Sequence, residues 1–388
     1  MKKFIIPFCN RFLFVFIIGF IVTIPINFYF FPDLGSILSV FTEGFVQLFL
    51  QDTAYTLHSD SLVMYIWVVL LFILSVLISF VWTLIQKKEK GYISLLVGQI
   101  ATYYLSLILL IYGFNKVFNY QFYFPEPNTI FTPLGQLSPD ILFWSSMGSS
   151  FTYSFFAGLI ELIPAILLLF KKTRLLGAII AFGVLVNVAM LNFGFNISVK
   201  IFSLFLVFLS LVVLQPDFKR LAAFFLGNSV IPQKKADYKF TSNTYKKAYP
   251  YVKVLLIGLL LFETLGGYFH TGYFNGAAVP KTIGFGAYNL NQNSLNIKKV
   301  FIHSKGYFII ESNGDNFQDY KMEWLDKDNL ELTNYANQKT ILLAYWELGE
   351  LRQLEGDLFG DIIKWELNRI DLETLPIYQT GFTWVSDL

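Results

Sequence analysis

A single carboxylate, Glu161, lies within the apolar segment 156–166, FAGLIELIPAI. A charge at the centre of a membrane-spanning helix costs at least about 2.5 kcal/mol, so such a residue is expected to have a partner or a function. Two chemistries fit it: a proton-accepting site beside a quinone ring, and a binding site for a polar headgroup. The structural alternative is a protonated Glu161 that is hydrogen-bonded to a neighbouring helix and locks the two helices together.

The spacing of the polar residues around Glu161 predicts which side of the helix it occupies. Ser146, Ser150, Ser154, Gly158 and Glu161 are separated by four, four, four and three residues. In one continuous helix these positions share a face, and small residues there allow a neighbouring helix to approach. We therefore expect the carboxylate to point into a helical bundle and away from lipid.

The neighbouring apolar segments offer two candidate partners for Glu161. At 1.5 Å per residue, Glu161 lies about 18 Å from the outer edge of its span, and Asn187 lies about 20 Å from the inner edge of the next. The sequence therefore predicts that Glu161 faces Asn187. Lys116 lies about 24 residues from the inner edge of its own span, at the outer interface. We expect no direct ion pair between Lys116 and Glu161.

Polar residues also gather at the outer ends of these spans. Lys116 follows Tyr112 closely, and Asn192 precedes Asn196 and Lys200. Together they indicate a polar vestibule for a ligand or proton. The structural alternative for Lys116 is an interfacial anchor within an aromatic belt.

The composition indicates an integral membrane protein and excludes several cofactor classes. The 388 residues are 55% hydrophobic and 14% charged, against about 25% charged in soluble domains. A lone cysteine, Cys9, excludes an internal disulfide and a Cys-x-x-Cys motif. No haem, nucleotide or metal motif is present, so the cofactor is unknown, with a quinone or a lipid as candidates.

Seven apolar segments are long enough to cross a bilayer. They cover residues 12–31, 62–86, 92–114, 145–170, 175–195, 199–215 and 251–270. Cytoplasmic loops retain Lys and Arg, and alternate loops here carry sixteen basic residues against two near the membrane in the others. This distribution predicts a membrane protein with a cytoplasmic N-terminus and a C-terminal region on the opposite side of the membrane. Glu263, in the middle of the last segment, is expected to make an interhelical contact.

The C-terminal region has a different pattern. Short alternating segments such as YFIIE and TILLAYW are separated by SKG, NGDN, DKDN and EGD, which favours an antiparallel all-β domain. Counting the final TGFTWVSDL, about eight strands are expected, in a barrel or sandwich. Residues 281–388 hold ten basic and sixteen acidic residues, a net charge of −6, which does not suit nucleic acid.

These patterns predict five parts along the chain. They are two N-terminal transmembrane helices (1–91), a four-helix membrane core (92–225), a cytoplasmic linker (226–250), a seventh transmembrane helix (251–270) and a periplasmic β domain (271–388).

The stretch 112–225 resembles the DoxX-like superfamily of four-helix membrane proteins. The residues that carry the resemblance are Gly113 with Lys116, Gly158 with Glu161, and the basic turn 171–174. The β-rich tail with its aromatic GF-x-W ending is similar to DoxX-like proteins of Bacteroidota envelopes, and this similarity implies a bacterial inner (cytoplasmic) membrane protein with a periplasmic β domain. Family members include subunits of thiosulfate:quinone oxidoreductase and thiol-redox accessory proteins, so the resemblance implies an architecture more firmly than a reaction.

Two functions remain open from the sequence, with a third less favoured. The first is a non-catalytic subunit or anchor of a cell-envelope complex, which binds membrane lipids and docks an envelope protein through its β domain. The second is an accessory component of a quinone- or thiol-linked oxidoreductase, whose redox centre a partner must supply. A transporter is disfavoured because the chain lacks two matching halves with broken helices.

Overall fold

The computed structural model describes residues 2–26, 28–50, 58–86, 91–227, 232, 243–291, 297–313 and 316–378. The chain forms two compact units. The helical unit contains Met1–Val117 and Phe156–Gly272, and the barrel unit contains Phe118–Phe155 and Tyr273–Leu388. The segment 118–155, which the sequence assigned to the membrane core, therefore belongs with the barrel.

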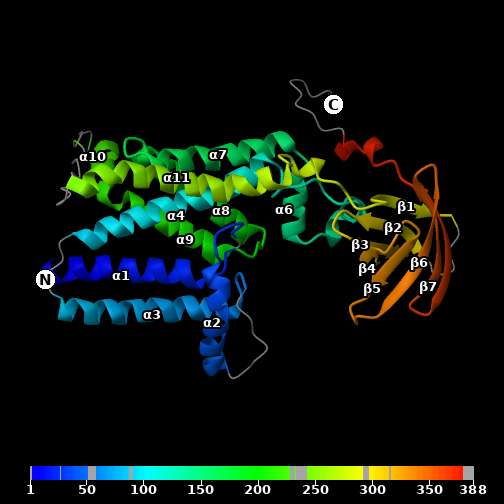
Figure 1. The fold of residues 1–388 in the computed structure, drawn as a ribbon, viewed down its shortest axis with the longest axis horizontal. Helices are drawn as coiled ribbons and strands as arrows, with labels where there is room; N and C mark the ends of the chain where they lie inside the picture. The colour runs from blue at the N-terminus through cyan, green and yellow to red at the C-terminus, as the bar shows by residue number, and fades with distance from the viewer. Residues whose placement is uncertain are drawn as a thin grey trace. The chain divides into compact units, whose positions relative to one another are not determined.

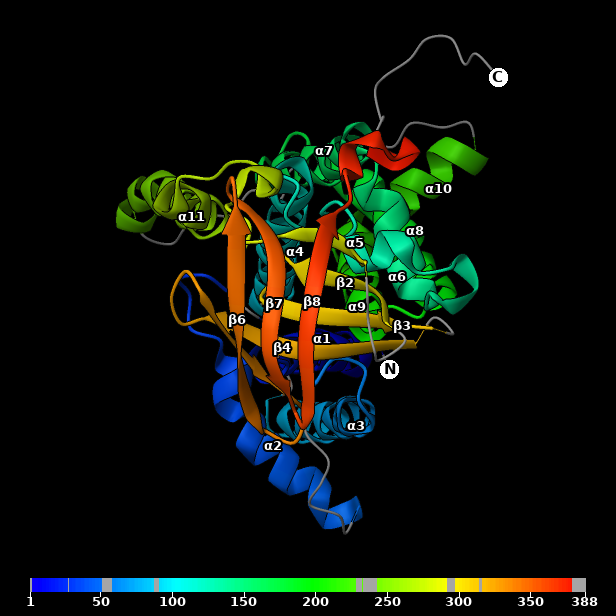
Figure 2. The ribbon, with the colours of Figure 1, turned by 90° about the vertical axis from the view of Figure 1, so that its right-hand side faces the viewer.

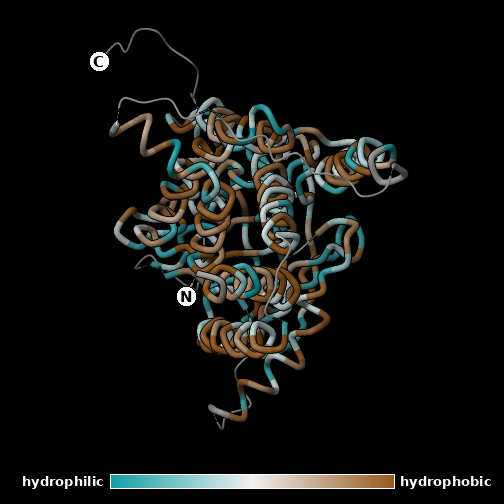
Figure 3. Tube along the Cα trace, turned by 90° about the vertical axis from the view of Figure 1, so that its left-hand side faces the viewer, coloured by the Kyte–Doolittle hydropathy of each residue, from teal (hydrophilic) through white to brown (hydrophobic). Residues whose placement is uncertain are grey.

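Seven long apolar helices, each sufficient to cross a membrane, are present among the described residues, as predicted. Figure 1 shows α1, α3 and α4 running alongside one another in the helical unit, and Figure 3 shows the apolar character of these helices. The seven are α1 (Lys2–Thr23), α3 (Leu62–Ile85), α4 (Tyr92–Val117), α7 (Phe151–Leu169), α8 (Arg174–Gly194), the run of α9 (Lys200–Leu214) and α10 (Phe218–Leu226), and α11 (Asn243–Thr271). A shorter apolar helix, α2 (Leu34–Leu50), follows α1.

Two predicted spans have different boundaries in the structure. The first helix, α1, ends at Thr23 rather than near residue 31, and Pro25 follows it in a segment that leads into α2. The fourth span is broken: α6 (Pro139–Gly148) ends before α7 begins at Phe151. At the break, a Cβ on Gly148 would lie 2.0 Å from the carbonyl oxygen of Tyr123, so only glycine fits.

This break corrects the predicted polar face. Ser146 lies on α6, Ser150 lies between the helices, and Ser154 lies on α7, where its hydroxyl donates to the Met147 carbonyl at 2.8 Å. The three serines therefore do not share one continuous helix with Glu161. The hydroxyls of Ser150, which accepts from the Tyr153 N–H at 3.3 Å, and of Ser154 both bond to backbone at the helix break.

The core of the helical unit forms around α4, on which twelve positions are buried. Helices α1 and α9 pack against it, and the rings of Phe20 and Phe205 stack with their centroids 3.7 Å apart. Helix α2 runs across the direction of α1 and α3 in Figure 1. Side chains along its length are exposed, including Ile37, Phe41 and Leu48.

The C-terminal region forms a closed antiparallel barrel in which each strand pairs with the next and β1 pairs with β8 (Figure 2). The described residues of this region contain eight strands, which agrees with the predicted total of about eight in a barrel or sandwich. They are β1 (Gly286–Leu290), β2 (Ile297–His303), β3 (Tyr307–Ser312), β4 (Asn316–Trp324), β5 (Asn329–Thr333), β6 (Lys339–Glu347), β7 (Glu350–Leu358) and β8 (Asp361–Arg369).

Two of these strands differ from the segments that the sequence indicated. The pattern missed β1 and β7, and the predicted turn EGD (355–357) lies inside β7, where Gly356 has a φ of +152°. That conformation lets the strand continue through a residue that otherwise signals a turn. The expected final strand TGFTWVSDL lies outside the described residues, and so does most of the predicted cytoplasmic linker (226–250), apart from residues 226–227, residue 232 and the start of α11.

The barrel interior is filled with apolar and aromatic side chains. Trp365 and Tyr288 are each 1% exposed, and Leu330, Leu342 and Leu354 are fully buried. Eight-stranded barrels of this width are closed by their own side chains. The interior is therefore a hydrophobic core.

The segment after α4 packs on the outside of this barrel. It contains the short helix α5 (Pro127–Phe131), and the Phe131 ring lies 5.8 Å from that of Phe301, which points outward from β2. The carboxylate of Glu126, just before α5, accepts hydrogen bonds from the backbone N–H of Ser304, at 3.1 Å, and from its hydroxyl. These contacts explain why 118–155 belongs to the barrel unit.

Candidate functional site

Lys116 and Glu161 form a buried ion pair between α4 and α7. Lys116 Nζ lies 2.7 Å from Glu161 Oε2, and the two side chains are only 8% and 6% exposed. The sequence-based expectation that these residues do not pair is wrong. Each charge compensates the other, which a buried ionic group requires.

Two glycines bring the helices close enough for the pair to form. A Cβ on Gly158 would lie 2.7 Å from the carbonyl oxygen of Gly113, and a Cβ on Gly113 would lie 2.7 Å from the side chain of Leu162. The backbones of α4 and α7 are therefore in direct contact. Close contacts of this kind between small residues hold membrane helices together.

The direction of helical side chains explains the ion pair. The helices are antiparallel, because Gly113 meets Gly158 whereas Ser106 donates to the carbonyl of Ala165 at 2.8 Å. Lys116 and Glu161 each follow a glycine by three residues, and helical side chains lean toward the N-terminus of their own helix. On antiparallel helices the two side chains therefore lean toward each other. A depth for Lys116 and Glu161 calculated only from the rise per residue does not include this convergence of their side chains, so it predicted no ion pair.

Tyr112 completes the immediate surroundings of the pair. Its ring centroid lies 5.4 Å from Lys116 Nζ, within the range of a cation–π interaction. On the adjoining turn, Asn115 accepts a hydrogen bond of 2.5 Å from the hydroxyl of Tyr268 on α11. The cluster joins three helices. Chemically it can lock them together, or exchange a proton if a ligand separates the two charges.

The two candidate asparagines of α8 have different environments. Asn187 is exposed, so the predicted Glu161–Asn187 contact is wrong, and the carboxylate has Lys116 as its partner. Asn192 is 5% exposed, and its amide nitrogen has no hydrogen-bond partner within the described part of the chain. Of the predicted vestibule, Asn196 and Lys200 do meet, with Lys200 Nζ donating to Asn196 at 2.9 Å.

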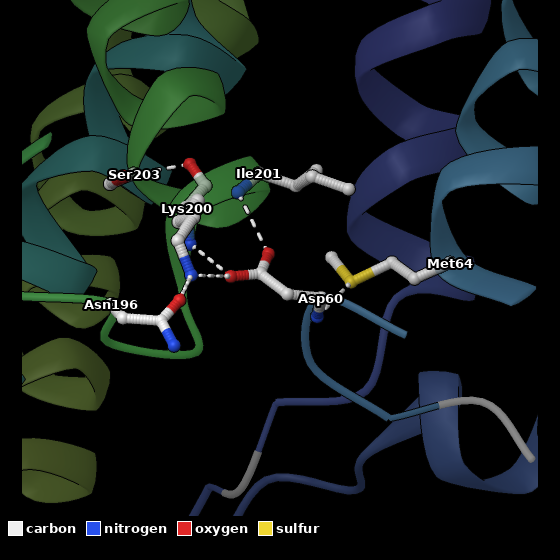
Figure 4. Close-up of polar contacts among 6 residues, drawn as sticks. All are labelled: Asp60, Met64, Asn196, Lys200, Ile201 and Ser203. Carbon is white, nitrogen blue, oxygen red and sulfur yellow. Dashed lines mark hydrogen bonds and ion pairs between the residues drawn. The ribbon is translucent and has the colours of Figure 1, made fainter. Parts of the chain in front are cut away.

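Asp60, which the sequence analysis did not single out, caps α9 at its first turn (Figure 4). Its carboxylate accepts hydrogen bonds from the backbone N–H groups of Lys200, at 2.7 Å, and Ile201, at 3.0 Å, and lies 3.8 Å from Lys200 Nζ. An acidic group at a helix N-terminus is stabilised by the unpaired N–H groups and the helix dipole. In the sequence, Asp60 is visible only as an acidic residue just before the apolar segment 62–86, and nothing there indicates that it caps α9.

Glu263 binds backbone rather than a side chain of another helix. Its carboxylate accepts hydrogen bonds from the N–H groups of three consecutive residues, Tyr29, Phe30 and Phe31, the last two at 3.0 and 2.9 Å. These residues lie between α1 and α2, where the helix has ended and its backbone needs partners. The expected interhelical contact is thus a contact between α11 and a loop.

Arg11 is a second buried ionic residue that the sequence analysis did not single out as a site. It is fully buried, donates to the carbonyl of Gln86 at 2.7 Å and lies over the ring of Trp82 at 5.2 Å. Gln86 is the C-cap of α3, where a cation meets the negative end of the helix dipole. Arg11 therefore fastens α1 to α3.

In the barrel unit, His303 lies beside the buried Glu126. The N–H of Lys305 donates to His303 Nδ1 at 3.0 Å, so this nitrogen is an acceptor and the imidazole is neutral. Burial lowers the pKa of His303; Glu126, 3.8 Å away, opposes this and Lys305 adds to it. Within the described residues, no cluster of three or more His, Cys, Asp or Glu side chains forms a candidate metal site.

Comparison with known proteins gives one relative without an established function. The chain is 29% identical over 131 residues to the uncharacterized protein YwoB of Bacillus subtilis (strain 168), a stretch covering 31% of this chain and 77% of that protein. No protein-family model and no solved structure matches the chain. A function for this chain is therefore inferred from its sequence and from the geometry of each unit.

Proposed function

We propose that this chain is a DoxX-like protein of the bacterial inner membrane that serves as a non-catalytic anchor or subunit of a cell-envelope complex. Its N-terminus is cytoplasmic and its barrel periplasmic, an orientation supported by the sixteen basic residues in alternate loops. The pairing of Lys116 with Glu161, three residues after Gly113 and Gly158, supports the DoxX-like class. The barrel docks a periplasmic protein.

The observation that carries this proposal is an apolar stripe on the outside of β6. Ile341, Leu343 and Tyr345 occupy three successive outward positions and are 49%, 45% and 48% exposed. On the solvent face of an antiparallel sheet these positions are ordinarily polar. Contiguous exposed apolar side chains with polar neighbours mark a protein interaction surface.

The neighbours of the stripe indicate the chemistry of the partner. Glu331 on β5 lies opposite Ile341, and Glu355 on β7 lies opposite Leu343. The C-terminal region as a whole carries a net charge of −6. Because each of these two carboxylates also pairs with a lysine of the barrel, the rim carries both signs of charge, and the surface fits a protein with an apolar centre and a rim of mixed charge. Because the barrel interior is already filled, its outer surface is what it offers to a partner.

A photo-crosslinker at position 343 tests the docking surface in native membranes, with the same group at position 298 as a matched control. Lys298 is an exposed residue on β2, on the opposite side of the strand order. One adduct of defined mass, formed from position 343 and lost when Tyr345→Lys is added, supports the proposal. No adduct, or equal adducts from both positions, overturns it.

Native mass spectrometry of the purified full chain tests the anchor role separately. A stoichiometric protein partner is expected to remain bound in mild detergent. A quinone that co-purifies with the wild type and is lost in Glu161→Gln would instead assign the chain to the quinone-linked accessory components.

A further inference from the structure

A pocket with a cavity volume of about 280 Å³ lies within the barrel unit, away from the β6 stripe. Its walls come from the segment after α4, the segment after α11 and the turn between β2 and β3. The first two segments are joined by a hydrogen bond of 2.8 Å from the Gly276 N–H to the Phe118 carbonyl. A Cβ on Gly276 would lie 2.4 Å from the Asn119 carbonyl oxygen, so the wall is closed tightly there.

Aromatic rings form much of the pocket lining. Tyr123, Phe124, Phe285 and Tyr378 line it, and the rings of Phe124 and Tyr378 are 4.3 Å apart. Faces of aromatic rings attract cations, and several rings around one cavity are the usual recognition site for an organic ammonium group.

Two hydrogen-bond acceptors lie among these rings. Asn119 lines the pocket and is 6% exposed, and its Oδ1 has no hydrogen-bond partner among the residues described. A buried acceptor without a partner costs free energy that a ligand donor recovers. Glu126, also lining the pocket and 6% exposed, adds a negative charge held in place by Ser304. Both groups favour a cationic donor.

Two lysines add the opposite charge at the same pocket. Lys281 Nζ lies 4.1 Å from the ring centroid of Phe285, and Lys305 Nζ lies 4.4 Å from that of Tyr123. Both side chains are exposed, so their ammonium groups remain available to an anion such as phosphate. Because these two rings already face a lysine ammonium, the rings of Phe124 and Tyr378 form the cation-binding part of the lining, and the two lysines form an anion-binding edge.

We propose that this pocket binds a zwitterionic headgroup with a primary ammonium and a phosphate, of the phosphoethanolamine type. The ammonium lies among the aromatic rings and donates to Asn119 Oδ1, and the phosphate meets Lys281 and Lys305. Asn119 follows the end of α4 by two residues, so its segment leaves the membrane at the level of lipid headgroups. The headgroup belongs to a phospholipid or to the free aminoalkyl phosphate.

Native mass spectrometry of the full chain, with equimolar dioleoyl-phosphatidylethanolamine, -phosphatidylcholine and -phosphatidylglycerol, tests the proposal. We expect phosphatidylethanolamine to be retained about fivefold over phosphatidylcholine, which has no N–H to donate. Asn119→Gly removes the amide and accepts the φ of +56°, and it should abolish this preference. Equal retention of the three lipids, or an unchanged preference in Asn119→Gly, overturns the proposal.

Two further experiments identify the source of the headgroup and distinguish a loss of binding from a loss of folding. Lys281→Ala with Lys305→Ala alters only exposed side chains and should lower retention severalfold, whereas Lys327→Ala, in the β4–β5 turn, should not. Millimolar O-phosphoethanolamine that displaces the lipid supports recognition of the free headgroup; selective lipid binding that it does not displace supports the membrane lipid. An unchanged double-lysine variant counts against the site.

Discussion

The interior of the helical unit and the interior of the barrel differ in the charged side chains that they contain. The helical unit buries Arg11, Lys116, Glu161 and Glu263, and each contacts an opposite charge or backbone groups. The barrel core consists of apolar and aromatic side chains, and the hydroxyl of Tyr288 there donates to the Gly284 carbonyl at 2.5 Å. Lipid tails are as apolar as the side chains of the helices, so apolar burial does not drive helix association in a bilayer. Polar contacts and close packing at glycines hold such helices together instead. In water, burial of apolar surface is sufficient.

The largest expected effect comes from breaking the ion pair on one side. Glu161→Leu leaves the ammonium of Lys116 buried without its counter-charge, which typically costs about 3–5 kcal/mol. We expect a large loss in the free energy of unfolding, measured by denaturant titration of the full chain in detergent. Adding Lys116→Met should recover most of it, because an apolar pair of similar volume replaces the ionic one. A Glu161→Leu variant as stable as the wild type would show that the pair does not hold α4 and α7 together.

Two adjacent residues of β6 test the barrel half of the comparison. Leu342 is fully buried in the interior, whereas Leu343, on the opposite face, is 45% exposed. Leu342→Ala should cost about 2–5 kcal/mol of barrel stability, and Leu343→Ala should change it by about 0.5 kcal/mol or less. Thermal unfolding followed by tryptophan fluorescence measures both. Equal losses would contradict the assignment of the two faces.

A smaller effect is expected at the glycine contact between α4 and α7. Gly158→Ala places a Cβ 2.7 Å from the Gly113 carbonyl and the Val117 side chain, so the helices must separate. Overpacking of this kind costs about 1–3 kcal/mol. Gly183→Ala is the matched control, because no atom lies within 4 Å of its added Cβ. Denaturant titration in detergent should separate the two variants; similar curves would reject the contact.

The sequence predicted the elements of each unit better than the contacts between them. The seven apolar segments and six of the eight strands reflect local composition and were found from the sequence, whereas β1 and β7 were missed. The Lys116–Glu161 pair depends on the lean of two side chains and on the crossing of α4 and α7 at two glycines. The break at residues 149–150 depends on the approach of Gly148 to Tyr123, more than twenty residues away along the chain. Contacts that depend on tertiary geometry cannot be read from the spacing of residues along the sequence.

The contacts of the two carboxylates Asp60 and Glu263 also could not be predicted from the sequence. Asp60 and Glu263 were visible as isolated acidic residues beside or within apolar segments. Their partners are backbone N–H groups of α9 and of residues 29–31, which have no signature of residue type. Residue spacing can suggest side-chain partners, whereas five of the six contacts of these two carboxylates are with backbone N–H groups and one is with the ammonium of Lys200.

The smallest predicted effect is a pH dependence confined to the barrel unit. Because burial lowers the pKa of His303 in the folded chain, the unfolded chain binds a proton more readily. Stability is then fully present above the ordinary histidine pKa of about 6.5 and falls as the pH drops through it. Melting temperatures of the full chain at pH 7.5 and pH 5.5 measure the loss.

The substitution His303→Asn isolates this contribution from the other titrating groups. The side-chain oxygen of asparagine can accept the hydrogen bond that the Lys305 N–H donates to Nδ1, and it cannot be protonated in this range. The variant should match the wild type at pH 7.5 and melt at a higher temperature than the wild type at pH 5.5. If Glu126 instead stabilised a charged imidazole, the order at pH 5.5 would be reversed, because the 3.8 Å contact would then strengthen as the pH falls. The sign of that difference decides whether the buried histidine belongs with the apolar contacts of the barrel or with paired charges like those of the helices.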